Sequence, residues 1–246
     1  MTTPAHEPEL LGQSVVVLGG SAGIGLETAR RARTEGAEVV LVGRDPGRLE
    51  RAAGEVGARS TAAFDATDAD ALAAFFQDLP TPIDHVMVTA GGPSYGPLLA
   101  MSAAEVRDAI SDHAVLELEV ARSAAGRVRP GGSLVFMGGT GARRVGRGLG
   151  VASAATNALP PFTAALALEL APVRVNLIAA GFVDTPLSAS LLGERLEERR
   201  AELRAMLPIG RVVQPADVAA LAVHLMTNTA LTGATYDIDG GQQFVS

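Results

Sequence analysis

The feature that most constrains the fold is a glycine-rich turn between a short apolar run and a helical pattern. The run Ser14 to Leu18 leads into Gly19-Gly20-Ser21-Ala22-Gly23-Ile24-Gly25, and a helix is predicted from Gly23 to Thr34. Glycine permits a tight turn and a close approach of the backbone to a ligand, and a helix N-terminus attracts anions. In this strand-turn-helix context the loop predicts a site for the pyrophosphate of a dinucleotide.

Short apolar runs alternate with helical patterns along the rest of the chain. Most of these runs lack alternation of polar and apolar residues, which is typical of strands buried on both faces of a parallel sheet. Helices must then cover both faces, so we predict a doubly wound α/β fold with a seven-stranded parallel sheet. The predicted strands are Ser14–Leu18, Glu38–Val42, Thr61–Phe64, His85–Thr89, Ser133–Met137, Val173–Ile178 and Thr235–Ile238. The predicted helices are Gly23–Thr34, Pro46–Glu55, Asp68–Phe76, Ala103–Arg127, a stretch ending near Leu170, and Pro215–Met226.

Length and charge restrict the possible partners. A chain of 246 residues, 48% of them hydrophobic, is long enough for one packed core, so we expect a flexible N-terminus over 1–10 and a single domain over 11–246. A net charge of −7 disfavours binding to nucleic acid or to an anionic membrane surface. The absence of cysteine excludes disulfides and thiolate metal sites, and we expect no metal. The N-terminus lacks the pattern of a signal peptide, so a cytoplasmic location is expected.

Three segments interrupt this regular order. Residues 140–150 contain several glycines and the arginines Arg143, Arg144 and Arg147, which predicts a mobile loop. Residues 187–207 place charged residues among leucines at helical spacing, which predicts an amphipathic lid with a solvated charged face. Pro160 and Pro161 fall inside a helical pattern, where prolines favour a kink or a new start, so residues 151–159 are expected to be irregular.

Several ordered motifs resemble those of the short-chain dehydrogenase/reductase family. They are Leu18–Gly25, Phe64–Thr67, Val88–Gly91, Val173–Asn176 leading to Ala180–Thr185, and Leu231–Gly233 leading to Asp239–Gly241. The resemblance spans about residues 11 to 244 and implies a Rossmann-type fold, a nicotinamide cofactor, a small-molecule substrate and a homodimer or homotetramer. The residues that it implies for cofactor binding are Gly19, Ser21, Ala22, Gly23, Ile24, Gly25, Arg44, Asp65, Ala66, Ala90, Gly91, Thr156, Gly181, Val183 and Thr185. Among them, Asp65 is expected to accept from the adenine amino group and Thr185 to hold the nicotinamide carboxamide.

The tip of the second predicted strand indicates which cofactor is used. An acidic residue at this tip would bind the adenosine ribose and repel a 2′-phosphate. Gly43 occupies the position and Arg44 follows it. Because a guanidinium offers forked donors to a phosphate and a plane that stacks on adenine, the pattern predicts NADP(H).

The catalytic positions of the family are changed in this sequence. The family uses serine, tyrosine, lysine and asparagine, and alignment from the neighbouring motifs puts Gly139, Ala152, Thr156 and His113 at those places. The chain contains no lysine, and its only tyrosines are Tyr95 and Tyr236. A positioned proton donor contributes about 100- to 10,000-fold to the rate, so the set expected from the resemblance cannot operate here.

His113 and Tyr95 are the candidates for a replacement proton donor. His113 is expected to point from the fourth helix toward the site, and Tyr95 lies in a glycine-rich loop at the carboxyl edge of the sheet. The alternative interpretation is that His113 only fills the asparagine position structurally and that Tyr95 only packs as a lid. The sequence is thus compatible with an NADP(H)-dependent oxidoreductase acting on an activated carbonyl, quinone or imine, with a non-catalytic NADP(H)-binding sensor or partner subunit, and with a lyase or isomerase that uses His113.

Overall fold

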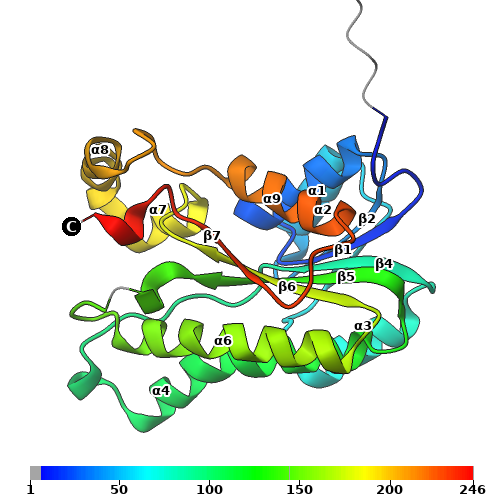
Figure 1. Ribbon diagram of the computed structural model, residues 1–246, viewed down its shortest axis with the longest axis horizontal. Helices are drawn as coiled ribbons and strands as arrows, with labels where there is room; N and C mark the ends of the chain where they lie inside the picture. Colours follow the sequence, from blue (N-terminus) through cyan, green and yellow to red (C-terminus); the bar gives the residue numbers. More distant parts are fainter. Residues whose placement is uncertain (1–6, 144, 246) are drawn as a thin grey trace, which may run out of the picture.

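The central feature of the structure is one parallel sheet with helices on both faces (Figure 1). The computed structural model describes residues 7–143 and 145–245, and within these ranges seven strands pair in the order β3-β2-β1-β4-β5-β6-β7. The predicted doubly wound architecture is therefore confirmed. The strands are β1 Ser14–Leu18, β2 Glu38–Gly43, β3 Ser60–Ala63, β4 Ile83–Val88, β5 Val128–Gly139, β6 Arg174–Ala180 and β7 Thr235–Ile238.

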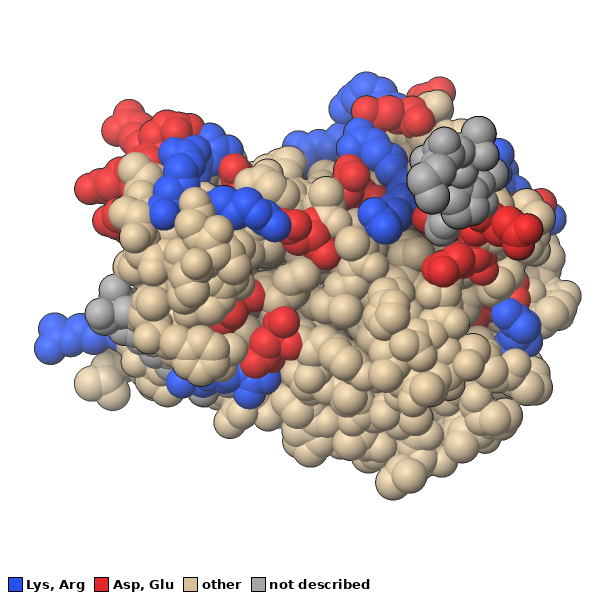
Figure 2. Space-filling model, turned by 45° about the horizontal axis from the view of Figure 1, so that its top comes forward, with Lys and Arg blue, Asp and Glu red and all other residues tan. Residues whose placement is uncertain are grey.

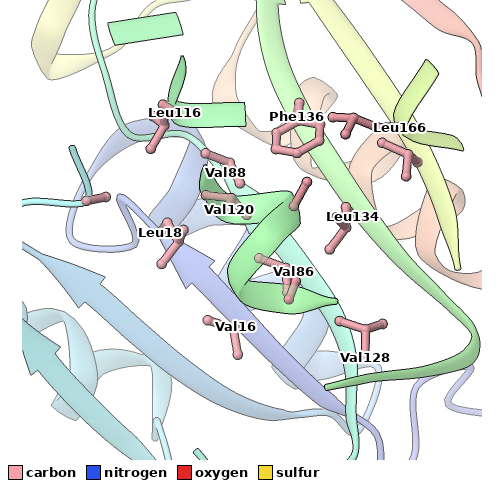
Figure 3. Packing of buried hydrophobic residues seen from close by; sticks show 14 of the residues in the cluster. Val16, Leu18, Val86, Val88, Leu116, Val120, Val128, Leu134, Phe136 and Leu166 are labelled. Atoms are coloured by element: carbon pink, nitrogen blue, oxygen red, sulfur yellow. The ribbon is translucent and has the colours of Figure 1, made fainter. Parts of the chain in front are cut away.

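The strands are composed mainly of apolar residues because helices cover both faces of the sheet. Along β1, Val16 and Leu18 belong to one hydrophobic cluster, and Val15 and Val17 belong to the other. Figure 3 shows the first cluster, in which Leu116 and Val120 from a helix pack toward strand residues such as Val86 and Phe136. Successive side chains of a strand point to opposite faces, so a strand between two such clusters contains no polar face.

The helices divide between the two faces of the sheet. The helices α1 (Gly23–Thr34), α2 (Pro46–Val56) and α9 (Pro215–Thr227) pack on one face. The helices α3 (Ala69–Asp78), α5 (Leu116–Ala124) and α6 (Gly150–Glu169) pack on the other, and α4 (Ala103–Ile110) precedes α5 in the chain. The strand order reverses between β1 and β4, and open sheets of this type bind ligands beyond the carboxyl ends of the strands at such a point.

Two predicted helices differ from the structure. The helix expected over Ala103–Arg127 is interrupted by a π-helical turn, η2 (Ser111–Val115), and ends at Ala124 because β5 begins at Val128. The kink expected at Pro160 and Pro161 is absent, since α6 is one continuous helix (Figure 1). Its buried stripe, which includes Leu159 and Leu166 on either side of the prolines, packs into the core and offsets the hydrogen bonds that the prolines remove. The helix is also long and apolar enough to span a membrane by length and composition, a property that core helices share.

The segment predicted as a mobile loop and the segment predicted as an amphipathic lid both contain ordered structure. A short 3₁₀ turn, η3, covers Thr140–Arg143, and the loop that follows is tied down where Gly148 O accepts a hydrogen bond from Gly96 N. Residues 187–207 form α7 (Pro186–Leu192), a 3₁₀ turn at Gly193–Arg195, and α8 (Leu196–Met206). The amphipathic prediction for this segment is confirmed, because Leu203 is buried while Glu197 and Glu202 are exposed.

The flexible N-terminus was predicted to extend too far. Leu10 is fully buried and its N–H donates to Glu35 O at 2.9 Å. The packed part of the chain therefore includes this residue.

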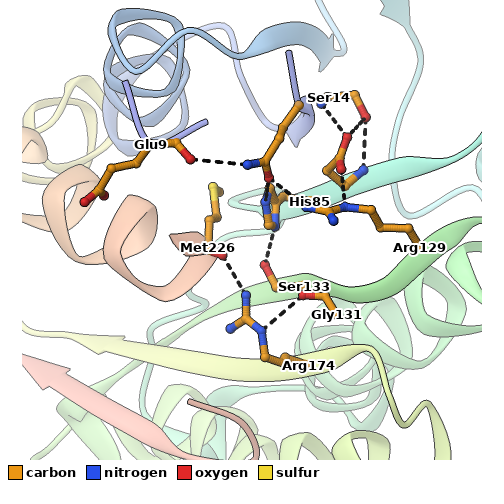
Figure 4. A network of polar contacts seen from close by, with 10 residues as sticks. Glu9, Ser14, His85, Arg129, Gly131, Ser133, Arg174 and Met226 are labelled. Carbon is orange, nitrogen blue, oxygen red and sulfur yellow. Dashed lines mark hydrogen bonds and ion pairs between the residues drawn. The ribbon is translucent and has the colours of Figure 1, made fainter. Parts of the chain in front are cut away.

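A polar network occupies the amino-terminal edge of the sheet (Figure 4). His85 is buried, and its ring contacts Ser133 Oγ and Gln13 Oε1, both at 2.8 Å. Because an amide oxygen only accepts, Nε2 donates to Gln13 and Nδ1 accepts from the serine hydroxyl. Burial lowers the pKa of His85 to about 3, so the ring is neutral and acts as a structural connector.

Candidate functional site

A cavity of about 420 Å³ opens at the carboxyl ends of β1, β2, β3 and β4. It lies at the strand-order reversal, where the first glycine loop meets the loop after β4. The residues that line it are Gly19, Ser21, Val42, Gly43, Arg44, Phe64, Asp65, Ala66, Thr67, Thr89, Ala90, Gly91, Gly92, Pro93, Asp112 and Leu187. This is a concave site with polar groups from several elements, of the kind that binds a small molecule.

The glycines of the first loop are required by close backbone packing. Gly19 has φ of +90°, and an added Cβ would lie 2.5 Å from Thr89 Oγ1. A Cβ on Gly25 would lie 2.3 Å from Gly19 O, so the first turn of α1 presses directly on the loop. Thr89 Oγ1 in turn lies 3.2 Å from Gly19 O, and this contact joins the loop to the residue that follows β4. The backbone at the floor of the cavity is therefore tightly fixed.

The N-terminus of α1 is available to an anion. Its N-cap is Ala22, which makes no side-chain cap, and the first turn has no acidic residue. The first N–H groups of a helix have no partner within the helix and carry a partial positive charge. The uncapped start of α1 therefore offers donors beside the loop, whereas the N–H groups of Gly19 and Gly20 both donate to Val42 O at 2.9 Å.

Arg44 and Asp65 define the opposite end of the cavity. Arg44 is 80% exposed, and its Nη1 lies 3.7 Å from Asp65 Oδ2. An exposed pair at this distance contributes little to stability, so the guanidinium remains free to move to a ligand. Asp65 Oδ1 accepts from both the N–H and the hydroxyl of Thr67, and these bonds hold the pKa of the Asp65 carboxyl below its usual value.

The cavity includes about half of the residues predicted to bind a cofactor. Those that line it are Gly19, Ser21, Arg44, Asp65, Ala66, Ala90 and Gly91. Those that do not are Ala22, Gly23, Ile24, Gly25, Thr156, Gly181, Val183 and Thr185.

The residues outside the cavity have structural contacts of their own. Thr185 lies beside Gly23 and caps α7, where its Oγ1 accepts from Ser188 N at 3.1 Å. Gly181 packs against Asp239, since an added Cβ would lie 2.6 Å from that side chain. Val183 is buried and pairs with Val213 in an isolated bridge.

The four substituted positions lie in or beside α6 and η2. An added Cβ on Gly139 would lie 3.5 Å from Thr156 Cγ2, so these two positions face each other. Thr156 Oγ1 donates to Ala152 O at 2.8 Å, and Ser153 Oγ donates to Gly141 O at 2.9 Å. Both hydroxyl hydrogens are therefore used by the backbone, and neither is a ready proton donor.

His113 lies in the π-helical turn and is half buried. Its Nδ1 lies 3.1 Å from Ala109 O, and because a carbonyl only accepts, Nδ1 carries the hydrogen. This leaves Nε2 as the nitrogen that can exchange a proton with another group. Single π-helical turns inserted in helices are frequent at functional sites, and the neighbouring Asp112 lines the cavity.

Tyr95 lies between Pro93, which lines the cavity, and Gly96, which donates to Gly148 O at 2.9 Å. Its side chain is 54% exposed. Partial burial of the phenol raises the pKa of Tyr95, so the group stays protonated at neutral pH and is a donor rather than a base. Of the loop arginines, Arg143 pairs with Asp237, while Arg144 lies outside the described residues.

Sequence reasoning missed two residues that line the cavity and one buried acid in α5. Asp112 and Leu187 line the cavity, but only the tertiary arrangement brings η2 and α7 to it. Glu117 is 3% exposed, its two carboxylate oxygens have no hydrogen-bond partner within residues 7–143 and 145–245, and burial raises its pKa to about 8. The sequence did contain a signal for this buried acid, because Glu117 lies within the apolar stripe that includes Leu116 and Val120.

Comparisons with known proteins agree with this geometry. Residues 19–243 match the family model described as enoyl-(acyl carrier protein) reductase. A short-chain dehydrogenase/reductase from Stachybotrys chlorohalonatus is 30% identical, and the match covers 95% of this chain and 98% of that protein. A solved short-chain dehydrogenase/reductase family protein superimposes with a TM-score of 0.86 at 31% identity, covering 96% of this chain and 100% of that one. A small-chain dehydrogenase solved in complex with NADPH gives a TM-score of 0.81 at 26% identity, covering 95% and 99%.

Proposed function

Because this chain belongs to the short-chain dehydrogenase/reductase family of oxidoreductases, we propose that it uses NADP(H) to reduce an activated carbonyl compound, a quinone or an imine. The observation that carries the proposal is a retained cofactor cavity beside a replaced catalytic set. The cavity keeps the glycine loop and has Arg44 at the tip of β2. Gly139 and Ala152 cannot supply a proton, which favours substrates that need little assistance.

The residues of the cavity fit a nicotinamide dinucleotide. A side chain at Gly19 would fill the cradle between the loop and Thr89, and the uncapped N-terminus of α1 offers N–H donors to a pyrophosphate. Arg44 would hold a 2′-phosphate, since Gly43 leaves no carboxylate at the tip of β2 to repel it. The similar dehydrogenase in complex with NADPH supports the phosphorylated cofactor.

The chemistry divides between the cofactor and the chain. When bound, the reduced dinucleotide supplies the hydride, which is chemistry that protein side chains do not provide. His113 would exchange a proton at Nε2, because Nδ1 is already committed to Ala109 O. Tyr95 would donate from its hydroxyl, which is protonated at neutral pH. Thr156 would contribute shape rather than a proton, because its hydroxyl donates to Ala152 O.

The loss of all four catalytic positions favours a second candidate function. A protein that binds NADP(H) without turning it over, as a sensor or a partner subunit, needs the cavity but not the proton donor. Such a protein would have Arg44 and the glycine loop for cofactor binding. It would not need serine, tyrosine or lysine at the positions of Gly139, Ala152 and Thr156.

Steady-state kinetics would distinguish the two functions. NADPH consumption is followed with quinones, diketones, imines and simple ketones for the wild type, His113→Ala and Tyr95→Phe, with Thr156→Ala as the control. We expect turnover of the activated classes, with about 100-fold or greater loss in at least one of the two donor variants and little change in the control. Turnover that neither donor variant affects would discard both donors. Tight NADPH binding without turnover of any class would replace the proposal by the non-catalytic function.

A further inference from the structure

Exposed apolar side chains gather at the end of the cavity where the loop after β4 meets α6 and α7. The set, called the apolar rim, consists of Tyr95, Leu98, Leu149, Leu187 and Leu191, which are between 37% and 54% exposed. A single exposed leucine needs no explanation, but a contiguous apolar patch beside a cleft marks a surface that binds something.

Contacts join the first three members of the apolar rim into one surface. The loop with Tyr95 is tied to the loop before α6, because Gly96 N donates to Gly148 O at 2.9 Å. Leu98 packs on the first residue of α6, since an added Cβ on Gly150 would lie 2.7 Å from Leu98 Cδ1. Leu149 directly precedes Gly150. Leu98 and Leu149 therefore lie at the start of the helix that includes Ala152, and the backbone of the Tyr95 loop is tied to the loop before that helix.

The remaining two members connect this surface to the cofactor cavity. Leu187 lines the cavity together with Pro93, which is two residues before Tyr95. Leu191 follows Leu187 by one turn of α7, and residues four apart share a face of a helix. The apolar rim thus extends from the cavity, and in Figure 1 α7 and the start of α6 both lie toward the left, at the same end of the sheet.

The floor beside the apolar rim is also poor in polar groups. Ala152 presents only a methyl group, and Thr156 directs its Cγ2 toward Gly139. The hydroxyl hydrogens of Ser153 and Thr156 are donated to backbone carbonyls. A substrate with many hydroxyl groups would lose hydrogen bonds to water on entering and would regain few of them.

Charge near the apolar rim does not favour an anionic substrate. Arg143 is paired with Asp237, and Asp112 adds a carboxylate to the cavity wall. Arg147 is exposed on the loop before α6. Of these three groups only Arg147 would attract a free carboxylate or phosphate on the substrate, and solvent screens its exposed guanidinium.

We propose that the substrate is an uncharged carbonyl compound or quinone whose apolar ring system lies against the apolar rim. This inference rests on the proposed reductase function and specifies its substrate class. In the reaction a hydride adds to the electrophilic centre, one proton adds to oxygen, the cofactor is oxidised and a quinone becomes its hydroquinone. The rim binds the ring system, and the reacting oxygen faces the donors His113 and Tyr95.

Matched quinones test the substrate class. With NADPH, kcat/KM is measured for 1,4-naphthoquinone, for 1,4-benzoquinone, which lacks the second ring, and for 1,4-naphthoquinone-2-sulfonate, which adds an anion. We expect naphthoquinone to exceed both by about tenfold or more, because an added apolar group in a fitting pocket has an effect of this size. A sulfonate that is the best substrate would overturn the proposal and assign the loop arginines to substrate binding.

Variants of the apolar rim test whether the substrate binds at this place. Leu149→Asp and Leu191→Asp are compared with Leu11→Asp, whose residue is 72% exposed and precedes β1 at the opposite edge of the sheet. We expect about tenfold or greater loss of kcat/KM for naphthoquinone in the two rim variants and no change in the control, with NADPH affinity unaltered in all three. Equal activity of wild type and both rim variants would overturn the proposal.

Measuring the binding of a ring compound directly distinguishes a failure of this inference from a failure of the proposed reductase function. The affinity of 2-naphthol, an uncharged ring compound that cannot be reduced, is measured by its fluorescence with NADP⁺ present. Binding that is lost in Leu149→Asp, even if no quinone is turned over, would support an apolar binding site in a non-catalytic protein. Absence of 2-naphthol binding to the wild type would contradict the rim as a ring-binding surface.

Discussion

At the scale of single residues, Arg44 is the side chain on which, in our proposal, the choice of cofactor depends. Arg44→Ala should weaken NADPH binding by about 10- to 100-fold, because hydrogen bonds to a charged group contribute about 1.5 to 3 kcal/mol. NADH affinity should change little, since that cofactor lacks the 2′-phosphate. Fluorescence titration of both cofactors measures the effect.

The control for this experiment is Arg48→Ala. Arg48 is also exposed, lies in the first turn of α2 and contacts Asp45 rather than the cavity. Its loss should leave both affinities unchanged. Equal weakening of NADPH and NADH by Arg44→Ala, or a wild type that prefers NADH, would contradict the assignment.

Glu117 makes stability depend on pH. Its ordinary pKa of 4.5 is raised to about 8 by burial, so the folded protein keeps a proton that the unfolded chain loses. The contribution of this group to stability is therefore fully present below pH 4.5 and is lost as the pH rises through 8. Glu117→Leu should raise the free energy of unfolding at pH 8 by roughly 2 to 4 kcal/mol and by much less at pH 5.

Urea unfolding of wild type and variant at the two pH values measures this difference. Glu119→Gln serves as the control, because Glu119 lies on the same helix and pairs with Arg122 at the surface. A Glu117→Leu variant that is destabilised equally at both pH values would show that the carboxyl has a favourable partner in the folded protein.

At the scale of elements, the contact between α1 and the glycine loop holds the cavity in shape. An added Cβ on Gly25 would lie 2.3 Å from Gly19 O and 2.5 Å from Thr89 Oγ1. Gly25→Ala must therefore move the helix or the loop, and we expect a loss of about 1 to 3 kcal/mol of stability together with weaker NADPH binding.

Gly54→Ala is the matched control for Gly25→Ala. Gly54 lies inside α2, and an added Cβ would meet nothing within 4 Å. This variant should be more stable by about 0.5 to 1 kcal/mol, because alanine restricts the unfolded chain and favours the helix. Thermal unfolding with and without NADPH measures both effects. A Gly25→Ala variant with unchanged stability and NADPH affinity would show that the glycine loop can move to accommodate the methyl group without loss of free energy.

The elements differ in how well the sequence predicted them. The strands and the helix Gly23–Thr34 were found because apolar runs and turn residues are local signals. The course of α6 through Pro160 and Pro161 was missed, because packing of its buried stripe outweighs a local preference. The π-helical turn at Ser111–Val115 was also missed, since nothing in its local pattern separates it from an ordinary helix.

The candidate site shows the same division between local and tertiary information. Gly19, Arg44 and Asp65 were predicted because they follow strands in recognisable motifs, and the structure brings them to one cavity. Asp112 and Leu187 reach that cavity from η2 and α7, which no local pattern could indicate. The hydrogen bond from Thr156 to Ala152 O likewise depends on a helix that the sequence predicted to be irregular.

At the scale of the whole molecule, the two edges of the sheet have different roles. The carboxyl edge holds the cavity and the apolar rim, while the amino edge is fixed by buried polar contacts (Figure 4). There Arg174 donates to backbone carbonyls that include Leu225 O at 2.7 Å and Met226 O at 2.6 Å, and so joins β6 to the end of α9. Loops at the carboxyl edge can differ in length and sequence without loss of the fold, because the polar contacts at the amino edge hold the sheet in place.

Charged side chains are unevenly distributed over the surface of the molecule (Figure 2). Figure 2 shows charged side chains gathered over α8 and around α1 and α2, and a broad face toward α6 and β7 with few of them. On α6, Leu168 is 82% exposed and Phe162 is 38% exposed. Exposed apolar side chains of this kind on a surface helix are typical of surfaces that a second copy covers.

We propose that the chain forms a homodimer or homotetramer through this face, and the prediction can be tested with one substitution. Leu168→Asp should place a charge in the covered surface and shift the wild-type oligomer to a smaller species at micromolar concentration, since a buried unpaired charge is costly. Light scattering coupled to size-exclusion chromatography measures the mass, and Leu11→Asp, at an apolar position that is 72% exposed before β1, should leave it unchanged. A wild type that is monomeric at these concentrations would contradict the proposal, and an oligomer unaffected by Leu168→Asp would move the interface away from α6.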